Sequence, residues 1–216
     1  NNGQTHDTFY VYDDYGNLTY VLPPKVEANI NKPSTIELNE LCYQYKYDYR
    51  NRLVEKKIPG KGWEYIVYDA LDRPVLTQDA NLRLTKHWLF SKYDELGRVV
   101  LTGKVWDANT NRNSIQNWIA NNFPSNQAPY TGNAITVDNQ VIRYNYSNSY
   151  PAGTSVELHT VNYFDNYIDL PSSGLGQTIT TSYRQTSTTR TKGLPTVSKT
   201  RVLATNKWIT TVTYYD

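Results

Sequence analysis

The chain has 216 residues, of which 38% are hydrophobic and 13% aromatic, including 20 tyrosines; this content excludes the disordered class and permits an aromatic core. The 22 basic residues nearly balance the 20 acidic ones, so charge provides no argument for binding nucleic acid or an anionic membrane. A single cysteine, Cys42, excludes an internal disulfide, and no apolar run approaches the roughly 18 residues needed for a membrane span.

The dipeptide Tyr-Asp recurs along the chain, and four of its copies are complete. A recurring unit predicts a repeat architecture. The motif residues are Tyr12, Asp13 and Gly16; Tyr47, Asp48, Asn51 and Arg52; Tyr68, Asp69, Asp72 and Arg73; and Tyr93, Asp94, Gly97 and Arg98. A β-prone stretch precedes each copy, and an apolar strand former follows three of the four, Pro74 being the exception. The unit is therefore predicted to be strand, tight turn, strand.

Each motif residue has a predicted structural role. The aspartate opens a type I turn and accepts a hydrogen bond from the backbone N–H two residues on. The residue four places after the tyrosine is Gly, Asn or Asp, the types that best tolerate a left-handed conformation. The tyrosine ring is expected on the core side with its hydroxyl near polar atoms, and the arginine stem over a neighbouring ring. Because one hairpin cannot bury its face alone, successive units are expected to pair edge to edge.

After Gly103 the regular pattern stops. Residues 105–140 are predicted to form a loop-rich insertion with a short helix near 113–123, because Ile115, Trp118, Ile119 and Phe123 have helical spacing. Asn113 or Ser114 is expected to cap its start, and Pro124 to end it.

Residues 1–104 are assigned to the four repeats and residues 141–216 to degenerate repeats truncated within the next copy. Within the latter, 163–167 (Tyr-Phe-Asp-Asn-Tyr) is interpreted as a weak copy, and 193–195 (Gly-Leu-Pro) as a turn. Residues 178–191 and 196–213, rich in Ser and Thr, alternate as strands do. The chain begins without Met and stops inside a motif, so a fragment is expected, with any export signal outside it.

The pattern Tyr-Asp-x-x-Gly-Arg-Val at 93–99 resembles the signature of the YD-repeat, or RHS-repeat, family. Residues 12–18 match it with Asn in place of Arg, whereas 47–53 and 68–74 depart at the glycine. The sequence around Tyr47, Leu-Cys-Tyr-Gln-Tyr-Lys-Tyr-Asp at 41–48, is similar to sequences in RHS proteins of Bacteroidetes-type bacteria. The resemblance implies an all-β fold in which antiparallel hairpin repeats form an extended, twisted or spiralling sheet, part of a hollow shell.

The resemblance also implies a function. Bacterial members of this family are secreted or lie at the cell surface, where the shell encloses a C-terminal domain of a polymorphic toxin; animal members use it for adhesion. We therefore expect a non-catalytic scaffold whose partners are the remainder of the same polypeptide, including further repeats and a C-terminal cargo domain. No catalytic residue, metal ligand or cofactor is assigned, and a self-cleaving aspartate segment is not found here.

Other readings of the same residues remain open. The wealth of Tyr and Trp is also compatible with a carbohydrate- or cell-surface-binding module, and an exposed strand edge with self-association. A glycan-acting enzyme is a weak third alternative, because the repeated placement of the aspartates at turn starts already explains them. The histidines (His6, His87 and His159) lack metal-ligand spacing, and Cys42 is expected to be a buried, inert thiol.

Overall fold

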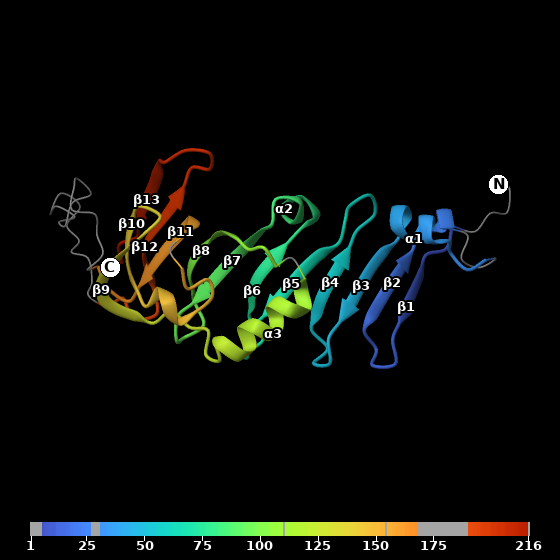
Figure 1. The fold of residues 1–216 in the computed structure, drawn as a ribbon, viewed down its shortest axis with the longest axis horizontal. Helices are drawn as coiled ribbons and strands as arrows, with labels where there is room; N and C mark the ends of the chain where they lie inside the picture. The colour runs from blue at the N-terminus through green and yellow to red at the C-terminus, as the bar shows by residue number, and fades with distance from the viewer. Residues whose placement is uncertain (1–5, 27–30, 110, 154, 168–189, 216) are drawn as a thin grey trace. The chain divides into compact units, whose positions relative to one another are not determined.

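The structure, a computed structural model, describes residues 6–26, 31–109, 111–153, 155–167 and 190–215. Within these ranges it contains thirteen strands, almost all of them paired antiparallel, and three short α-helices (Figure 1). The predicted all-β class is therefore confirmed. The chain divides into two compact units: residues 1–88 with 106–124, and residues 89–105 with 125–216. In the described ranges, no helix has both the length and the apolar character needed to cross a bilayer.

The first unit is built from three hairpins whose strands follow one another in the sheet in chain order. Hairpin 1 consists of β1 (Phe9–Tyr12) and β2 (Leu18–Leu22), hairpin 2 of β3 (Tyr43–Tyr47) and β4 (Leu53–Lys57), and hairpin 3 of β5 (Glu64–Tyr68) and β6 (Pro74–Gln78). Each hairpin ladder has four residue pairs. The ladders between hairpins, β2–β3 and β4–β5, have only two.

Two short helices of this unit lie in connections and were not predicted. Helix α1 (Thr35–Leu41) begins at Ser34, which forms a capping box with Glu37, and α2 (Ala80–Leu84) begins at Asp79. Both starts have the sequence signature of an N-cap. Near α1, a small apolar core contains Leu22, Val26 of the 3-10 turn η1 (Pro24–Val26), and the predicted buried thiol of Cys42.

Helix α3 (Arg112–Asn122) confirms the predicted helix, but its cap is Asn111 and not Asn113 or Ser114. The Asn111 side chain accepts a hydrogen bond from the Ser114 N–H at 3.0 Å. Of the predicted apolar face, Ile115 and Ile119 are buried, whereas Trp118 is largely exposed. Helix α3 packs against β5 of the first unit.

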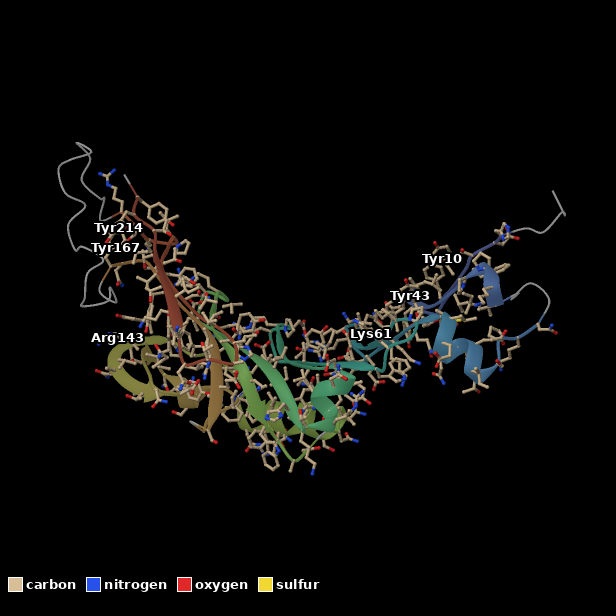
Figure 2. The ribbon with its side chains drawn as sticks, turned by 90° about the horizontal axis from the view of Figure 1, so that it is seen from above. Tyr10, Tyr43, Lys61, Arg143, Tyr167 and Tyr214 are labelled. Carbon is tan, nitrogen blue, oxygen red and sulfur yellow. The ribbon has the colours of Figure 1, made fainter. Side chains whose placement is uncertain are left out.

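The two faces of hairpins 1 and 2 differ. Tyr10, Val21 and Tyr43 are register partners across three strands, so their side chains form a row on one face. Both tyrosines are exposed, and Figure 2 shows them on the same side of the sheet. Since side chains alternate along a strand, Leu22 and Cys42 lie on the opposite face.

The second unit contains β7 (His87–Tyr93, from Leu89 on), β8 (Val99–Trp106), β11 (Val156–Phe164), β12 (Pro195–Arg201) and β13 (Trp208–Val212), adjacent in that order. Two further strands, β9 (Tyr130–Val137) and β10 (Gln140–Tyr144), form a separate antiparallel pair. Strand β9 therefore lies within the segment for which the sequence predicted mainly loop. The alternating stretch 178–189 lies outside the described residues.

A buried ammonium group organises the core of the second unit. Lys92 has no exposed surface, and its Nζ donates to the carbonyls of Tyr146, Ser149 and Pro151 and to the Ser149 hydroxyl at 2.7–2.9 Å. The Nζ also lies 3.9 Å from the centroid of the Tyr146 ring. Burial lowers the pKa of Lys92 well below its ordinary value, while this cage of acceptors favours the charged form.

Candidate functional site: the turn ladder

All four predicted turns have the same hydrogen-bond pattern. In each, Oδ1 of the motif aspartate accepts from the backbone N–H groups two and four residues on. The distance from Oδ1 to the backbone nitrogen two residues later is 3.0 Å for Asp13–Tyr15, 2.9 Å for Asp48–Arg50, 2.9 Å for Asp69–Leu71 and 2.9 Å for Asp94–Leu96. The hydrogen bond expected from the sequence is thus present, together with a second one that the sequence analysis missed.

The residue four places after each motif tyrosine has the predicted left-handed backbone. The φ angles are 81° for Gly16, 58° for Asn51, 62° for Asp72 and 77° for Gly97. The N–H of each of these residues donates to the carbonyl of its aspartate and closes a turn of four residues. In the first three hairpins the strand register also shifts by one residue at the motif tyrosine. This combination is a type I turn followed by a bulge, which suits the twist of a hairpin.

The motif arginine binds the aspartate of its own turn, a contact that the sequence analysis missed. Arg52, Arg73 and Arg98 donate from Nε to the second carboxylate oxygen at 2.8, 2.7 and 2.6 Å. In the first repeat Asn17 takes this place, with Nδ2 3.0 Å from Oδ2 of Asp13. The expected contact with an aromatic ring is also present for Arg52, whose guanidinium lies 4.8 Å from the centroid of the Tyr68 ring. Charge-assisted pairs of this kind are the stronger hydrogen bonds in proteins.

Neighbouring turns in the first unit are joined through equivalent positions. Asn17 of hairpin 1 donates to Asn51 of hairpin 2 at 3.1 Å, and Arg52 of hairpin 2 donates to Asp72 of hairpin 3 at 2.8 Å. In the other direction, each tyrosine hydroxyl donates to a backbone carbonyl of the preceding hairpin: Tyr47 to Leu18 at 2.9 Å and Tyr68 to Leu53 at 2.7 Å. We call this set of turn residues and their links the turn ladder.

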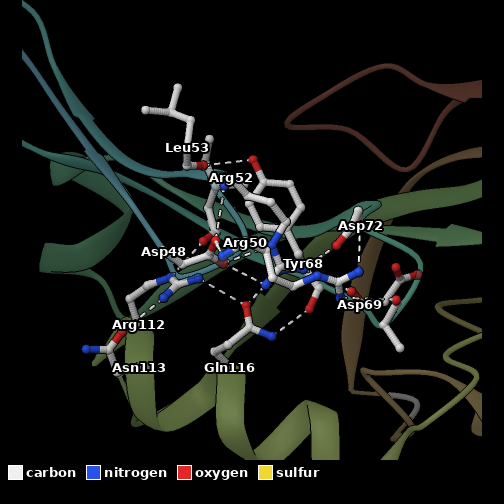
Figure 3. Close-up of polar contacts among 12 residues, drawn as sticks. Asp48, Arg50, Arg52, Leu53, Tyr68, Asp69, Asp72, Arg112, Asn113 and Gln116 are labelled. Atoms are coloured by element: carbon white, nitrogen blue, oxygen red, sulfur yellow. Dashed lines mark hydrogen bonds and ion pairs between the residues drawn. The ribbon is translucent and has the colours of Figure 1, made fainter. Parts of the chain in front are cut away.

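Helix α3 lies beside β5, and two of its polar side chains reach the backbone of that strand (Figure 3). The Gln116 amide donates to the carbonyl of Tyr68 at 2.7 Å and accepts from the Tyr68 N–H at 3.0 Å. Arg112, one turn earlier, donates to the carbonyl of Ile66 at 2.9 Å and to Gln116 at 3.1 Å. A glutamine side chain thus satisfies the strand edge that the short β4–β5 ladder leaves without a strand partner.

The fifth turn, between β11 and β12, is a split copy of the motif. Asp165 N–H donates to the carbonyl of Leu194 at 3.0 Å, as Asp94 does to that of Arg98 in the intact turn. Gly193, with φ 86°, donates its N–H to the Asp165 carboxylate at 2.6 Å. Residues 166–192 separate the aspartate from its glycine. The weak copy at 163–167 and the turn at 193–195 therefore form one turn that resembles the motif. It differs in that Asp165 itself has a positive φ of 73° and in that the Gly193 N–H donates to the carboxylate and not to the aspartate carbonyl.

Hydrogen bonds and ion pairs favour the ionised form of two turn aspartates, Asp48 and Asp165. Burial alone would raise the pKa of Asp48, but hydrogen bonds from Arg52 and Arg50 lower it below its ordinary value. Arg98, which binds Asp165 through two hydrogen bonds of 2.9 and 2.7 Å, is the main cause of the lowered pKa of Asp165. Both groups are therefore ionised at neutral pH and hold backbone and guanidinium donors in place.

Two further candidates from the sequence are the thiol of Cys42 and a metal site. Cys42 is fully buried, and burial raises the pKa of its thiol, which disfavours the reactive thiolate. Across the described ranges, no three side chains of the types His, Cys, Asp and Glu converge in a way that would hold a metal ion.

Comparisons with known proteins add little to this geometry. The sequence matches no protein-family model and no curated protein. Among solved structures, it is similar to chains in the crystal structures of TcdB2-TccC3-Cdc42, of TcdB2-TccC3 without the hypervariable C-terminal region, and of TcdB2-TccC3-TEV. The identities are 15, 15 and 14%, with a TM-score of 0.34 in each case. The matches cover 95, 95 and 89% of this chain but only 9, 9 and 8% of those chains. A TM-score this low does not indicate a shared fold.

Proposed function

We propose that the chain is a non-catalytic β-scaffold, one segment of a larger secreted or cell-surface bacterial repeat protein that encloses or presents a C-terminal, toxin-like domain. The observation that carries this proposal is the turn ladder. Each hairpin of the first unit is joined to the next through the same positions, so each repeat prepares the binding site for its neighbour. Such a unit extends by addition of further copies, as in repeat proteins generally.

The edge of the first unit supports growth beyond the described strands. Tyr12 occupies the position from which Tyr47 and Tyr68 reach back to a preceding hairpin, and it is 58% exposed on the edge strand β1. All four residues of β1 are exposed. A strand edge that presents unpaired backbone groups accepts another strand. We therefore propose that β1 pairs with a further repeat of the same polypeptide, and with a second copy when that repeat is absent.

The scaffold role is tested on the full polypeptide from which this chain comes. We expect protease to spare its C-terminal domain while the repeats are intact, and to digest that domain rapidly once the repeats are cleaved at an engineered site. A matched polypeptide without the engineered site controls for the protease. Equal digestion of the C-terminal domain in the cleaved and the uncleaved protein would refute enclosure.

Edge pairing is tested on the chain itself by size-exclusion chromatography over a range of concentrations. We expect concentration-dependent self-association, which Tyr10→Pro on the edge strand should weaken. Asp13 donates its N–H to Asn17 within the hairpin, so the N–H of Tyr10, an odd number of residues away, points to the outer edge, and proline cannot donate to a ladder there. Val141→Pro, at an exposed position outside β1, is the matched control. A strict monomer at every concentration would contradict the proposal.

A further inference from the structure

A guanidinium covers the ring of the motif tyrosine in the seam between hairpins 2 and 3, which we call seam 2. The guanidinium of Arg52 lies 4.8 Å from the centroid of the Tyr68 ring (Figure 3). Three acceptors hold it at 2.7–3.3 Å: the carboxylates of Asp48 and Asp72 and the carbonyl of Asp69. A planar guanidinium suits this place because its edge binds carboxylates while its face lies on a ring.

The second unit contains the same arrangement. The Arg98 guanidinium lies 4.3 Å from the centroid of the Phe164 ring, and Phe164 stands where the motif has its tyrosine. Arg98 donates to the carboxylate of Asp94 in its own turn and to that of Asp165 in the next turn. A ring of the following hairpin and acceptors of both turns therefore form a recurring guanidinium site.

Seam 1, between hairpins 1 and 2, has the parts of this site without its arginine. Asn17 occupies the position that Arg52 has in hairpin 2. The ring and the three acceptors that correspond to those of seam 2 belong to Tyr47, Asp13, Asn51 and Asp48. The Asn17 amide donates to Asp13 at 3.0 Å and to Asn51 at 3.1 Å. Within the part of the chain that the structure describes, no basic side chain lies over the Tyr47 ring.

Seam 1 also keeps a negative charge that seam 2 neutralises. Hydrogen bonds from Asn17 lower the pKa of Asp13, so its carboxylate is ionised at neutral pH. No basic side chain among the described residues forms an ion pair with it. The nearby Lys46 ammonium is already engaged, since it lies 2.7 Å from the Glu55 carboxylate and 4.4 Å from the centroid of the Trp63 ring. One added positive charge would therefore neutralise seam 1.

The two motif tyrosines have different electrostatic surroundings. Burial is the main cause of a raised pKa at both Tyr47 and Tyr68. At Tyr68 the positive charges of Arg52 and Arg112 partly oppose this rise. At Tyr47 the negative charge of Asp13 adds to it. The surroundings of Tyr47, as well as its ring, therefore favour a cation.

A pocket of about 560 Å³ lies in seam 1, and its lining includes the residues that correspond to the guanidinium site, Asp13, Tyr47, Asp48 and Asn51. Tyr15 and Tyr49 also line it. Tyr15 stands where hairpin 2 has Arg50, whose guanidinium donates to Asp72 at 2.8 Å. Seam 1 thus lacks both arginines that hairpin 2 directs into seam 2, and it has the volume of a small-ligand site.

We propose that seam 1 binds a guanidinium group supplied by a ligand, either the arginine side chain of a peptide or a free alkylguanidine. The group lies on the Tyr47 ring and donates to the Asp13 carboxylate and the Asn51 side-chain oxygen. Three donors already reach the Asp13 carboxylate, and because a carboxylate has about four acceptor positions, one is left for the ligand. This activity is separate from the scaffold role, which needs no ligand in the seam.

The test uses the isotopically labelled chain and N-acetyl-argininamide, in which the guanidinium is the only charged group. Titration to about 20 mM should shift the amide resonances of Asp13, Tyr47 and Asn51 saturably. The matched control probe is N-acetyl-citrullinamide, which has nearly the same shape but an uncharged urea group, and it should cause no saturable shift. N-acetyl-lysinamide should bind more weakly than the arginine probe, because its ammonium cannot lie flat on a ring and pair with a carboxylate edge at once.

Asn17→Arg is the decisive variant, because it supplies the guanidinium from within the chain. Its Tyr47 resonances should move toward those of the ligand-bound unaltered chain, and its affinity for N-acetyl-argininamide should fall at least about tenfold. The matched variant Asn17→Gln keeps a neutral amide and should retain the affinity. Unchanged resonances of hairpin 3 and of the second unit would verify that both variants fold.

Two further probes distinguish the sources of the guanidinium: butylguanidine, and a capped peptide with one arginine between glycines. Tighter binding of the peptide supports an arginine side chain as the ligand, and tighter binding of butylguanidine supports a small molecule. The proposal is overturned if no guanidinium probe produces saturable shifts, or if the citrulline probe binds as tightly as the arginine probe. Binding that survives Asn17→Arg unchanged would also overturn it.

Discussion

The turns of hairpins β7–β8 and β11–β12 in the second unit share an aspartate N–H bond and a glycine with positive φ, but they differ in the chain length between these two residues and in the aspartate backbone, which has a φ of 73° at Asp165. In β7–β8, Asp94 and Gly97 are separated by two residues; in β11–β12, Asp165 and Gly193 are separated by residues 166–192. In both, the aspartate N–H donates to the backbone carbonyl of the residue after the glycine, and the glycine has a positive φ.

The comparison shows that an aspartate and a glycine with positive φ can close such a turn whether two residues or a long segment lies between them. The carboxylates differ in burial, however: the Asp94 side chain is 7% exposed and that of Asp165 34%. In the intact turn the carboxylate holds two backbone N–H groups and its own arginine. In the split turn it holds Gly193 and the arginine of the preceding repeat, Arg98.

The largest expected effect is that of Asp94→Ala in the intact turn. We expect a loss of about 3 kcal/mol, because the change leaves two backbone donors and the Arg98 guanidinium without their nearly buried acceptor. Hydrogen exchange at β7 and β8 amides measures it locally, together with denaturant unfolding. Glu95→Ala, at an exposed position in the same turn, should cost under about 0.5 kcal/mol. Equal effects of the two changes would contradict the role of Asp94.

Asp165→Gly in the split turn should cost less, about 1–2 kcal/mol, because its carboxylate is more exposed and better solvated. Glycine is used because Asp165 has a φ of 73°, at which alanine would add strain. The measurement is hydrogen exchange at β11 and β12. Asp165→Asn separates the two contacts, since the amide oxygen can still accept from Gly193 while the charge opposite Arg98 is lost. A cost for Asp165→Gly as large as that of Asp94→Ala would show that burial does not set the difference.

Gly97→Ala and Gly193→Ala should each cost about 1 kcal/mol, because alanine is strained at φ of 77° and 86°. Apart from the adjoining residues of the chain, no atom of the described residues lies within 4 Å of a Cβ added at either glycine, so the cost is conformational and not steric crowding. Asparagine at either position should cost less than alanine. Thermal unfolding of the four variants checks the order, and a tolerated Gly193→Ala beside a damaging Gly97→Ala would break the equivalence of the two turns.

Removal of residues 166–190 should leave the second unit folded, with a change in stability within about 1 kcal/mol. The deletion joins Asp165 to Thr191 and Lys192 and so restores two residues before Gly193. A shorter loop lowers the entropic cost of closure, while the hydrogen bond between Tyr167 and Tyr215 is lost. Hydrogen exchange at β11 and β12 is the measurement. Unfolding of this hairpin on deletion would mean that Asp165 and Gly193 do not form one turn.

The smallest effect is that of acid on the split turn. The pKa of Asp165 is lowered in the folded state, so its stabilising contribution is fully present above its unfolded pKa of about 3.9 and is lost as pH falls through the lower folded value. Stability of the second unit should therefore decrease below about pH 4. The Asp165→Asn variant should show a shallower decrease in urea titrations from pH 7 to about pH 2.5. An unchanged slope would exclude Asp165 as a contributor.

The local parts of the turns could be predicted from the sequence because they depend on neighbours in the chain. An aspartate that binds the N–H two residues on, and a Gly or Asn that accepts positive φ, are properties of five or six consecutive residues. For this reason the four turns, the strands beside them and α3 were expected. The Asn111 cap of α3 was missed by two or three residues, since several polar residues there are suitable caps.

The contacts between distant residues could not be predicted in this way. Nothing in the sequence near Arg52 indicates that its guanidinium reaches Asp72, or that Gln116 binds the backbone of Tyr68, because these contacts depend on how hairpins are placed. The split turn is the clearest case. Its halves at Asp165 and Gly193 were each noticed, but a motif interrupted by so long a segment has no local signal that joins them.

The unequal ladders of the first unit have a mechanical consequence. Four residue pairs hold each hairpin together, but only two pairs join one hairpin to the next. Under tension across the strands, the hairpins should behave as stiff plates that part at their joints before they open internally. The hydrogen bonds of the Tyr47 and Tyr68 hydroxyls and of the Gln116 amide reinforce those joints. Their removal should therefore lower the force at which hairpins separate, while each hairpin stays folded.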